Sequence, residues 1–432
     1  MPRFPFRSLA AALLLSLLAI CAESQTAPIP QSQLSSVQAP QPRVTSYTLS
    51  PNLLQESYAL YLTSVWLFFA TTIYGFALAI LYLRRRWIAR FRDFAARLSG
   101  RRVVQALIVI PLFALTVSLF LLPFEIYGQH VERHYGLSVQ TWPSWLRDWF
   151  IALALTLLAA TVLSYILYAI IRRSPRRWWL WFWLAFLPIS AFVTFIEPVA
   201  IDPLFDKYEP LANKRSALVA ELQKVAQRGG LNIPASRMFE MKASEKLTGS
   251  NAYVTGFGAT KRIVVWDTAI QKMTKEQIAF VFGHEMGHYV LGHIVQGFVF
   301  MAAVSLLLLY LTYCLANWML CRWGAQWDIP GLDDWASLPL FWLVISVLLF
   351  LSGPGLNAFS RHLEHQADQY GLEVVHGLIP DSSQVAAQSF QKLGEEWLEY
   401  PYLSKFAVWW AWDHPPIPDR IRFALTYDPW SA

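Results

Sequence analysis

Six stretches of mainly apolar residues divide this chain, and each is close to the length needed to cross a lipid bilayer. About 20 helical residues span the roughly 30 Å of hydrocarbon in a membrane. The stretches lie near residues 59–83, 103–123, 149–171, 178–199, 298–319 and 338–353. Of the 432 residues, 55% are hydrophobic and only 15% are charged, which is unlike a water-soluble globular protein. We therefore expect a polytopic α-helical membrane protein.

Residues 1–22 have the form of a secretory signal. Arg3 and Arg7 precede an apolar run that ends near Ala22, and residues 23–57 read as a flexible polar linker rich in Pro, Gln and Ser. The apolar run is short for a membrane span. An uncleaved first membrane helix is the alternative, so the expected number of spans is six or seven.

Arginine clusters flank the apolar stretches. The loop 84–102 holds eight arginines and the loop 172–177 holds four, and such loops usually stay in the cytoplasm. Counting helices then puts residues 200–297 on the extracytoplasmic side. The loop 320–337, with three aspartates against one arginine, would be cytoplasmic as well, which its charge does not favour. The net charge of +6 reports topology, and without a base-reading motif we expect no nucleic-acid partner.

The polar stretch at 200–297 predicts a small α/β layer between the fourth and fifth spans. Residues 211–230 suggest a helix that is ended by Gly229 and Gly230. Three short strands are expected in the segments SRMFEM, NAYVTGF and KRIVVWD. The last two would pair as a hairpin around Gly258.

An H-E-x-x-H pattern follows directly, formed by His284, Glu285 and His288. Thr274 and Gln277 form a capping-box signature before an apolar run, which predicts that a helix begins here. A helix repeats about every 3.6 residues, so the two histidines lie one turn apart on one face and can bind one zinc ion. The carboxylate of Glu285 can take a proton from a water at such an ion. The alternative is a chance match with two ordinary polar histidines.

A third ligand is expected after the sixth span, where the sequence SRHLEHQADQYGLEVV begins at Ser360. Its pattern is helical, so Glu364 and Asp368 share one face. A catalytic zinc uses three protein ligands and leaves one position for water, and Glu364 is the candidate. Asp368 can accept the second N–H of a ligand histidine. Alternatively, both carboxylates pair with Arg361 or with lysines on a solvated helix face.

The remaining histidines and the cysteines carry weaker signals. The cysteines fit neither a disulfide framework nor a thiolate metal site, and they are Cys21, Cys314 and Cys321. His130 and His134 have helical spacing, but Glu132 stands at the wrong position for a base, so we expect no second metal there. His293 lies about 1.4 turns beyond His288, which rotates it away from the metal face and predicts a polar contact at the membrane edge.

Four motifs stand in fixed order along the second half of the chain. They are GSNAYVTGFGATKRIVVWDT at 249–268, FGHEMGHYVLGH at 282–293, SRHLEHQAD at 360–368 and HPPIPDRI at 414–421. Together they resemble the integral-membrane zinc metallopeptidases typified by the type I CAAX prenyl protease, with the bacterial heat-shock membrane protease as a more distant relative. Weaker likeness at 131–141 and 202–211 extends the resemblance to about 130–421.

The resemblance implies one zinc ion per chain, with His284, His288 and Glu364 as ligands and Glu285 as general base. It also implies that His414, in the HPP motif, lies near the metal. In this family the membrane helices enclose a large chamber with the zinc site at one end. The family's catalytic site faces the cytosol, whereas the arginine loops favour the opposite side.

The resemblance further implies that the strand around Asn251, Ala252 and Tyr253 is an edge along which a substrate backbone lies. One departure from the family pattern is His365, which replaces an aromatic residue after the ligand glutamate. We interpret His365 as a tolerated replacement; a spare ligand and a proton relay are the alternatives.

The predicted fold is a polytopic membrane protein with six or seven spans and a small zincin-like α/β catalytic layer. The catalytic layer and its H-E-x-x-H helix separate two sets of membrane helices, and C-terminal helices follow with the third ligand and the HPP motif. The expected segments are 1–22, 23–57, 58–199, 200–297, 298–355 and 356–432.

The expected activity is that of a zinc metalloendopeptidase in the bacterial inner membrane. It would hydrolyse peptide bonds of membrane-associated proteins or peptides, for turnover or processing. His414 and Arg361 would stabilise the negative charge of the tetrahedral intermediate. CAAX-type processing of lipidated C-termini is one alternative, and a membrane transporter or scaffold with a structural zinc is another.

Overall fold

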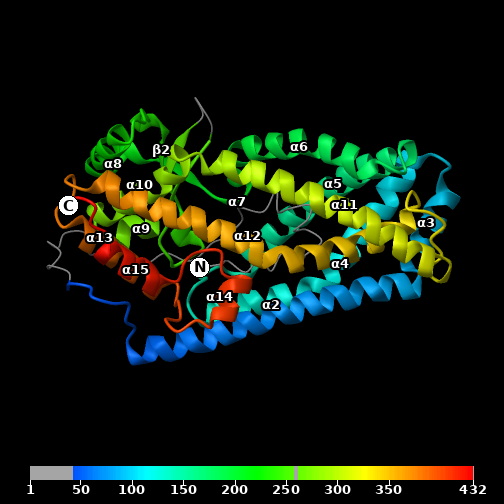
Figure 1. The fold of residues 1–432 in the computed structure, drawn as a ribbon, viewed down its shortest axis with the longest axis horizontal. Helices are drawn as coiled ribbons and strands as arrows, with labels where there is room; N and C mark the ends of the chain where they lie inside the picture. The colour runs from blue at the N-terminus through cyan, green and yellow to red at the C-terminus, as the bar shows by residue number, and fades with distance from the viewer. Residues whose placement is uncertain (1–41, 257–260, 432) are drawn as a thin grey trace.

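The computed structural model describes residues 42–256 and 261–431. Residues 1–22, most of the linker, Cys21 and Gly258 lie outside the described residues, so the interpretation of residues 1–22 stays a prediction. The described chain forms an elongated bundle of long helices with a smaller α/β layer at one end (Figure 1).

Six helices of the described residues are long and apolar enough to cross a membrane, which confirms the six predicted spans. They are α2 (Pro51–Arg85), α4 (Arg102–His134), α5 (Trp142–Arg173), α6 (Trp178–Ile196), α11 (His293–Trp327) and α12 (Leu338–Val375). The 38 residues of α12 measure about 57 Å, nearly twice the hydrocarbon thickness of about 30 Å. The long helices therefore project beyond the bilayer. At the far end of the bundle, α3 (Trp87–Leu98) connects α2 to α4.

The predicted strands are confirmed, and they form one four-stranded sheet. The strands are β1 (Tyr208–Pro210), β2 (Met238–Met241), β3 (Ala252–Thr255) and β4 (Arg262–Trp266), in the order β1-β2-β4-β3. β2 and β4 are parallel, and the other two pairs, including the expected β3–β4 pair, are antiparallel. β1 was not predicted, because three residues that end in a proline carry no alternating pattern.

The helix α10 (Lys275–Val290) is the centre of the α/β layer. It packs against β3, α8 (Ser216–Arg228), α12 and α13 (Ser382–Glu396). Its Ile278, Phe280 and Phe282 are buried in one core with side chains from α8, the sheet and α13. α8 ends as predicted at Gly229 and Gly230, and the φ of +73° at Gly230 is a backbone conformation that glycine adopts without strain.

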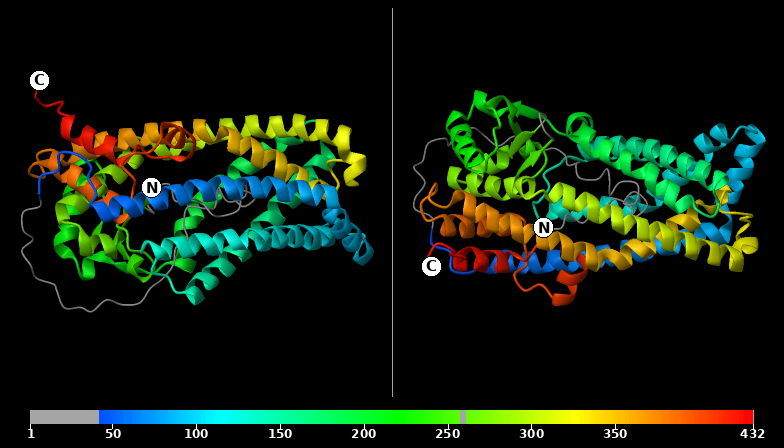
Figure 2. Two further views of the ribbon diagram at one scale, coloured as in Figure 1. Left: turned by 90° about the horizontal axis from the view of Figure 1, so that it is seen from below. Right: turned by 45° about the horizontal axis from the view of Figure 1, so that its top comes forward.

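Short elements complete the chain. They are α7 (Asp202–Phe205), α9 (Asp267–Lys272), α14 (Lys405–Ala411), α15 (Ile417–Thr426), a π-helical turn at Glu197–Ile201, and 3₁₀ turns at Leu211–Asn213, Ala235–Arg237, Ala243–Glu245 and Trp335–Ser337. The C-terminal helices α13 and α15 lie at the same end of the bundle as the α/β layer (Figure 2).

The helix with the expected third ligand is not a separate element. The sixth span and the SRHLEHQAD motif belong to one helix, α12, which continues through Pro354. Proline removes one backbone N–H from a helix, and its ring usually kinks or breaks the helix. Here the membrane span and the ligand-bearing segment form one continuous helix. The position of Glu364 is therefore set by a helix that is anchored in the bilayer.

The chain before α2 lies across α13. The side-chain amide of Gln384 both accepts from the backbone N–H and donates to the carbonyl of Val44, at 2.9 Å in each case. The buried Tyr47 donates its hydroxyl to the carbonyl of Glu399 at 2.8 Å. The start of the described chain is therefore held at the α/β end of the bundle.

A buried ion cluster joins the membrane helices to the α/β layer. The ammonium of Lys246 lies 3.0 Å from Asp148 Oδ2 and 3.1 Å from Asp206 Oδ1, and all three side chains are buried. Asp148 stands on the first turns of α5, and Asp206 follows α7. Removing one partner of such a cluster is costly because it leaves charge buried without compensation.

We expect Lys246→Met to destabilise the protein by about 3–5 kcal/mol, because Asp148 and Asp206 would lose the ammonium between them. Thermal unfolding of the purified protein in detergent measures the change. The control is Lys207→Met, because Lys207 is exposed and its half-buried partner Glu245 lies 2.8 Å away, and this change should cost about 1 kcal/mol or less. Equal losses in the two variants would contradict a special role for the buried cluster.

Candidate metal centre

The capping box predicted at the start of α10 is present. The Thr274 hydroxyl accepts from the backbone N–H of Gln277 at 3.2 Å, and the Thr274 N–H donates to the Gln277 side chain at 3.0 Å. This cap fixes where α10 begins, and with it the face on which the H-E-x-x-H residues lie. His284 and His288 emerge one turn apart, with their Nε2 atoms 3.3 Å from each other.

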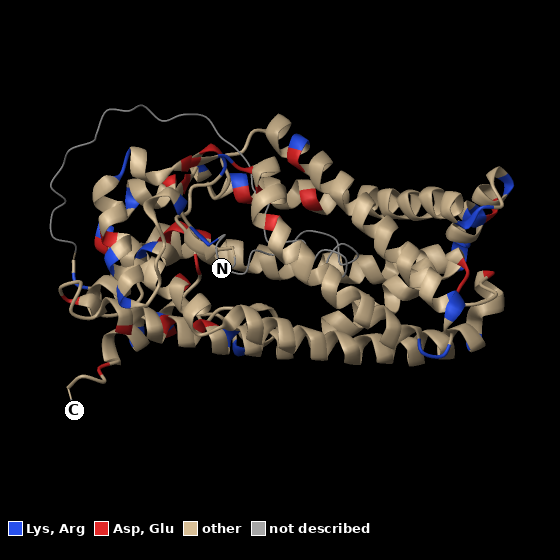
Figure 3. Ribbon diagram, turned by 90° about the horizontal axis from the view of Figure 1, so that it is seen from above, with Lys and Arg blue, Asp and Glu red and all other residues tan. Residues whose placement is uncertain are grey.

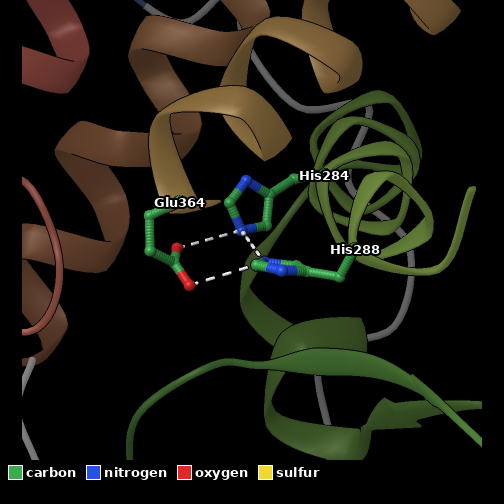
Figure 4. Close-up of side chains that lie close together, drawn as sticks. All are labelled: His284, His288 and Glu364. Carbon is green, nitrogen blue, oxygen red and sulfur yellow. Dashed lines mark hydrogen bonds and ion pairs between the residues drawn. The ribbon is translucent and has the colours of Figure 1, made fainter. Parts of the chain in front are cut away.

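The carboxylate of Glu364, from α12, completes a group of three metal-binding side chains (Figure 4). Its Oε2 lies 3.4 Å from His284 Nε2, and its Oε1 lies 3.4 Å from His288 Nε2. His284 and Glu364 are buried, and His288 is half-buried. The structure therefore brings together the three residues that the sequence singled out as ligands.

The spacing and chemistry of these three side chains fit a tetrahedral metal ion. Zinc–nitrogen bonds of about 2.0–2.1 Å at tetrahedral angles place two ligand atoms roughly 3.3–3.4 Å apart. The separations in the structure, 3.3 and 3.4 Å, have this value. Glu364 Oε2 is also buried, and its 3.4 Å contact is with His284 Nε2, another of the three ligand candidates, as expected of an oxygen that shares a metal with that nitrogen.

Glycines allow α10 and α12 to approach closely enough for this contact. A Cβ on Gly371 of α12 would lie 3.0 Å from the backbone nitrogen of His284, and one on Gly287 of α10 would lie 3.2 Å from Cα of Ala367. Backbone atoms cannot rotate out of the way as side chains can. The absence of these two Cβ atoms therefore sets the distance between the ligand helices.

We expect Gly371→Ala to weaken metal binding, because the added Cβ forces α10 and α12 apart by a few tenths of an ångström. The expected loss of affinity is roughly tenfold, similar to the loss seen when a residue that orients a ligand is removed. Competition with a chelator on the purified protein measures the affinity. The matched control is Gly355→Ala in the same helix, where a Cβ meets nothing within 4 Å. Unchanged affinity in both variants would show that this helix spacing does not control the site.

Asp368 and Arg420 hold the first histidine. Asp368 Oδ1 lies 2.8 Å from His284 Nδ1, and the guanidinium of Arg420 binds both oxygens of Asp368, with Nε to Oδ2 at 2.9 Å. Asp368 thus accepts the Nδ1–H of His284 and leaves the Nε2 lone pair toward the metal position. Arg420 was not predicted, although it lies in the HPPIPDRI motif, because no spacing rule joins residues that are 52 positions apart in the chain.

His293 contacts the second histidine, and its predicted position was wrong. Its Nδ1 lies 3.0 Å from Nδ1 of His288, and its Nε2 lies 3.1 Å from Gln366 Oε1. The prediction assumed that the helix continues, whereas α10 ends at Val290 and Gly292 turns the chain with a φ of +71° before α11 begins. The carbonyl of Gln366 only accepts, so His293 donates from Nε2 and accepts the Nδ1–H of His288.

We expect His293→Leu to lower metal affinity about 10- to 100-fold, because the tautomer of His288 would no longer be fixed. His293→Gln offers an amide oxygen that can accept the same hydrogen, so it should retain most of the affinity. Both variants are compared by chelator competition at one pH. If the glutamine variant binds metal no better than the leucine variant, the tautomer explanation is wrong.

The pKa values of the two histidines on α10 are shifted in opposite directions. Burial alone would lower the pKa of His284, but hydrogen bonds to Asp368 and Glu364 and their charges outweigh it and raise that pKa to about 10. Burial lowers the pKa of His288 to about 3, and the charge of His284 adds to this. Without a metal, His284 is therefore the protonated member of this pair of histidines and His288 is neutral. A metal ion must displace that proton, so metal affinity should fall as the pH decreases.

Glu285 lies beside the ligands on α10 and is half-buried. Burial raises the pKa of Glu285 to about 7, with the charge of His284 opposing the shift and that of Glu364 adding to it. A carboxyl group with a pKa near neutrality can both accept and return a proton at neutral pH. The arrangement is therefore suited to general acid–base chemistry.

His414 points toward the group of three ligands from the loop between α14 and α15. Its Nε2 lies 3.4 Å from Glu364 Oε1, and its Nδ1 lies 2.8 Å from Asp413 Oδ1. Arg361 reaches this loop from α12, where it donates to the backbone carbonyls of Val408, at 2.9 Å, and Trp412. These two contacts of Arg361 therefore go to the segment before His414.

The other residues singled out from the sequence lie around the site. Ala252 and Tyr253 belong to β3, which is an edge strand of the sheet, and Asn251 directly precedes it. His365 is exposed, and its ring lies against Phe423 with ring centroids 4.5 Å apart.

His130 and His134 are both exposed on α4, with ring centroids 6.4 Å apart. Among the described residues, the group of three ligands on α10 and α12 is the one cluster of His, Cys, Asp and Glu side chains that could hold a metal ion.

A bundle of membrane-spanning helices with an H-E-x-x-H helix and a glutamate facing it defines a membrane-embedded metalloprotease. The model of peptidase family M48 matches residues 212–428, and that of the CAAX prenyl protease N-terminal region, described as five membrane helices, matches residues 31–207. The chain belongs to peptidase family M48. It is a hydrolase and an integral membrane protein.

Relatives cover most of the chain. An uncharacterized metalloprotease of Bacillus subtilis, YhfN, is 35% identical over 83% of this chain and 80% of its own length. A CAAX prenyl protease 1 homolog of Oryza sativa is 30% identical over 69% of this chain and 68% of its own length. The crystal structure of S. mikatae Ste24p has a TM-score of 0.75 at 22% identity and covers 88% of this chain and 90% of that one. This likeness confirms the predicted fold.

Proposed function

We propose that this protein is a zinc metalloendopeptidase of the bacterial inner membrane that cuts membrane-associated proteins or peptides, for turnover or processing. The observation that carries the proposal is the convergence of His284, His288 and Glu364 beside Glu285 at the end of the membrane bundle. Two imidazoles and one carboxylate are the ligand set of catalytic zinc sites that keep a fourth position open. A structural site would fill that position with protein, and membership of a protease family removes the transporter and scaffold alternatives.

The protein's own side chains divide the work of peptide hydrolysis. When bound, zinc polarises the scissile carbonyl and acidifies the attacking water. Glu285 takes the proton of that water and returns it to the leaving amine. Asp368, held by Arg420, orients His284, and His293 orients His288, so that both ring lone pairs meet at one point.

The substrate would lie along the edge strand β3, beside Asn251, Ala252 and Tyr253. Main-chain hydrogen bonds to an edge strand bind extended peptides with little demand on their sequence. His414 would stabilise the oxyanion, an interaction worth roughly 3–4 kcal/mol in comparable sites. Arg361 supports His414 indirectly, because it holds the carbonyls of the segment just before it.

CAAX-type processing of lipidated C-termini is the second candidate. Relatives that carry the name CAAX prenyl protease favour it, and so does an apolar cavity of about 220 Å³ among the membrane helices, lined by residues such as Phe113, Phe186 and Met301. The signal-like residues 1–22 and the Bacillus subtilis relative point to a bacterial membrane, where prenylated substrates are unexpected. Membrane-protein turnover or processing therefore remains the first choice.

We expect Glu285→Gln to abolish cleavage of casein or a membrane-derived peptide, with a fall in rate of at least about 100-fold, because the attacking water loses its base. Metal analysis of the purified variant should still find about one zinc per chain, since Glu285 is not a ligand. His284→Ala should lose both the metal and the activity. Cleavage by Glu285→Gln at the wild-type rate would refute the protease mechanism.

A further inference from the structure

We infer that the metal site faces the extracytoplasmic side of the membrane. On the proposed function, its substrates are therefore protein segments exposed outside the cytoplasm. The two ends of the bundle differ in what they carry. One end carries α3 and the connections α5–α6 and α11–α12; the other carries the α/β layer, α13, α15 and the arm before α2 (Figures 1 and 3).

Positive charge in the short connections lies at the α3 end. The segments 84–102, 172–177 and 320–337 together hold thirteen arginines against four aspartates. The one short connection between spans at the metal end, residues 135–141, contains no lysine or arginine, and the helix turns that flank it hold two arginines, Arg133 and Arg147. In Figure 3, blue residues lie at both ends of the bundle, and at the metal end they are mixed with many red ones in the α/β layer and the C-terminal helices. Because basic residues in short loops are retained in the cytoplasm, the α3 end is cytoplasmic.

The charges within the α/β layer do not weigh against this orientation. The layer and the C-terminal helices follow or precede spans as long segments, and long segments cross the membrane largely regardless of their charge. The short connections therefore carry the main signal for the orientation.

The aspartates after α11, which appeared to contradict this orientation, are partners of an arginine in the first loop. Arg92 Nη2 lies 2.8 Å from Asp328 Oδ2, and its Nη1 lies 3.2 Å from Asp334 Oδ1. Arg86 also donates to the carbonyl of Gln326 at 2.8 Å. The acidic connection therefore belongs to the same side as the arginine loop, where its charge is compensated.

The order of the spans agrees with this assignment. Six alternating spans place the arm before α2, the α/β layer and the C-terminal helices on one side of the membrane. In the sequence, Arg3 and Arg7 precede the signal-like apolar run of residues 1–22, and a segment of this form delivers the following chain to the extracytoplasmic side. Two independent sequence signals thus give the same orientation.

This orientation narrows the class of substrate. Lipidated C-termini of cytoplasmic proteins would lie on the wrong side of the membrane. The β3 edge and the metal site instead meet extracytoplasmic loops of membrane proteins, or peptides released on that side of the bilayer. α12 extends beyond the hydrocarbon, so its ligand-bearing end lies close to the membrane surface.

Labelling of single cysteines in the full-length chain tests the orientation. The native cysteines are replaced by serine, and one cysteine is introduced at an exposed position of each end, as Gln227→Cys and Arg422→Cys at the metal end and Ala96→Cys and Pro175→Cys at the α3 end. Intact bacterial cells are treated with a membrane-impermeant maleimide. We expect labelling of the first pair in intact cells, and of the second pair only after the membrane is permeabilised.

Labelling of Ala96→Cys or Pro175→Cys in intact cells would overturn the inference, as would protection of Gln227→Cys and Arg422→Cys until permeabilisation. All four cysteines must react in detergent, which controls for local burial. The experiment is repeated with Glu285→Gln, because the labelling pattern does not depend on cleavage. A reversed pattern with an active purified enzyme rejects only the orientation, whereas the expected pattern with an inactive enzyme rejects only the proposed function.

Discussion

The contact between α10 and α12 is the interaction on which the metal centre depends. α10 is fixed inside the α/β layer by its capping box and by buried aromatic residues, whereas α12 is fixed by its membrane span. The two helices meet where Gly287 and Gly371 remove the Cβ atoms that would keep them apart. The three ligands can therefore converge only when the layer is seated correctly on the bundle, which couples metal binding to the joint between the two parts.

Local sequence patterns predicted the parts of the site that lie within one helix. Thr274 and Gln277 marked the start of α10, and helical spacing placed His284 with His288 and Glu364 with Asp368. Apolar length alone located the six spans. Periodicity is sufficient for such features because each depends on neighbours within about two turns.

The parts that were missed depend on a change of direction or on distant residues. His293 was misplaced because a single glycine ended α10 and turned the chain back toward His288. α12 was read as two helices because its composition changes near Pro354, although its backbone continues. Arg420 lies far from Asp368 in sequence, and only the packing of α15 against α12 brings them together. One sequence without a fold holds no signal for such a pairing.

Fold and orientation in this protein are set by different interactions. Helix packing, the glycine contact and the ligand geometry are the same whichever end of the bundle faces the cytoplasm. Orientation is decided by the basic residues of short connections, which contribute little to packing. Arg92 links the two requirements, because it adds positive charge to one connection and binds the aspartates of another. The fold and the ligand geometry therefore do not by themselves fix which side of the membrane the metal site faces.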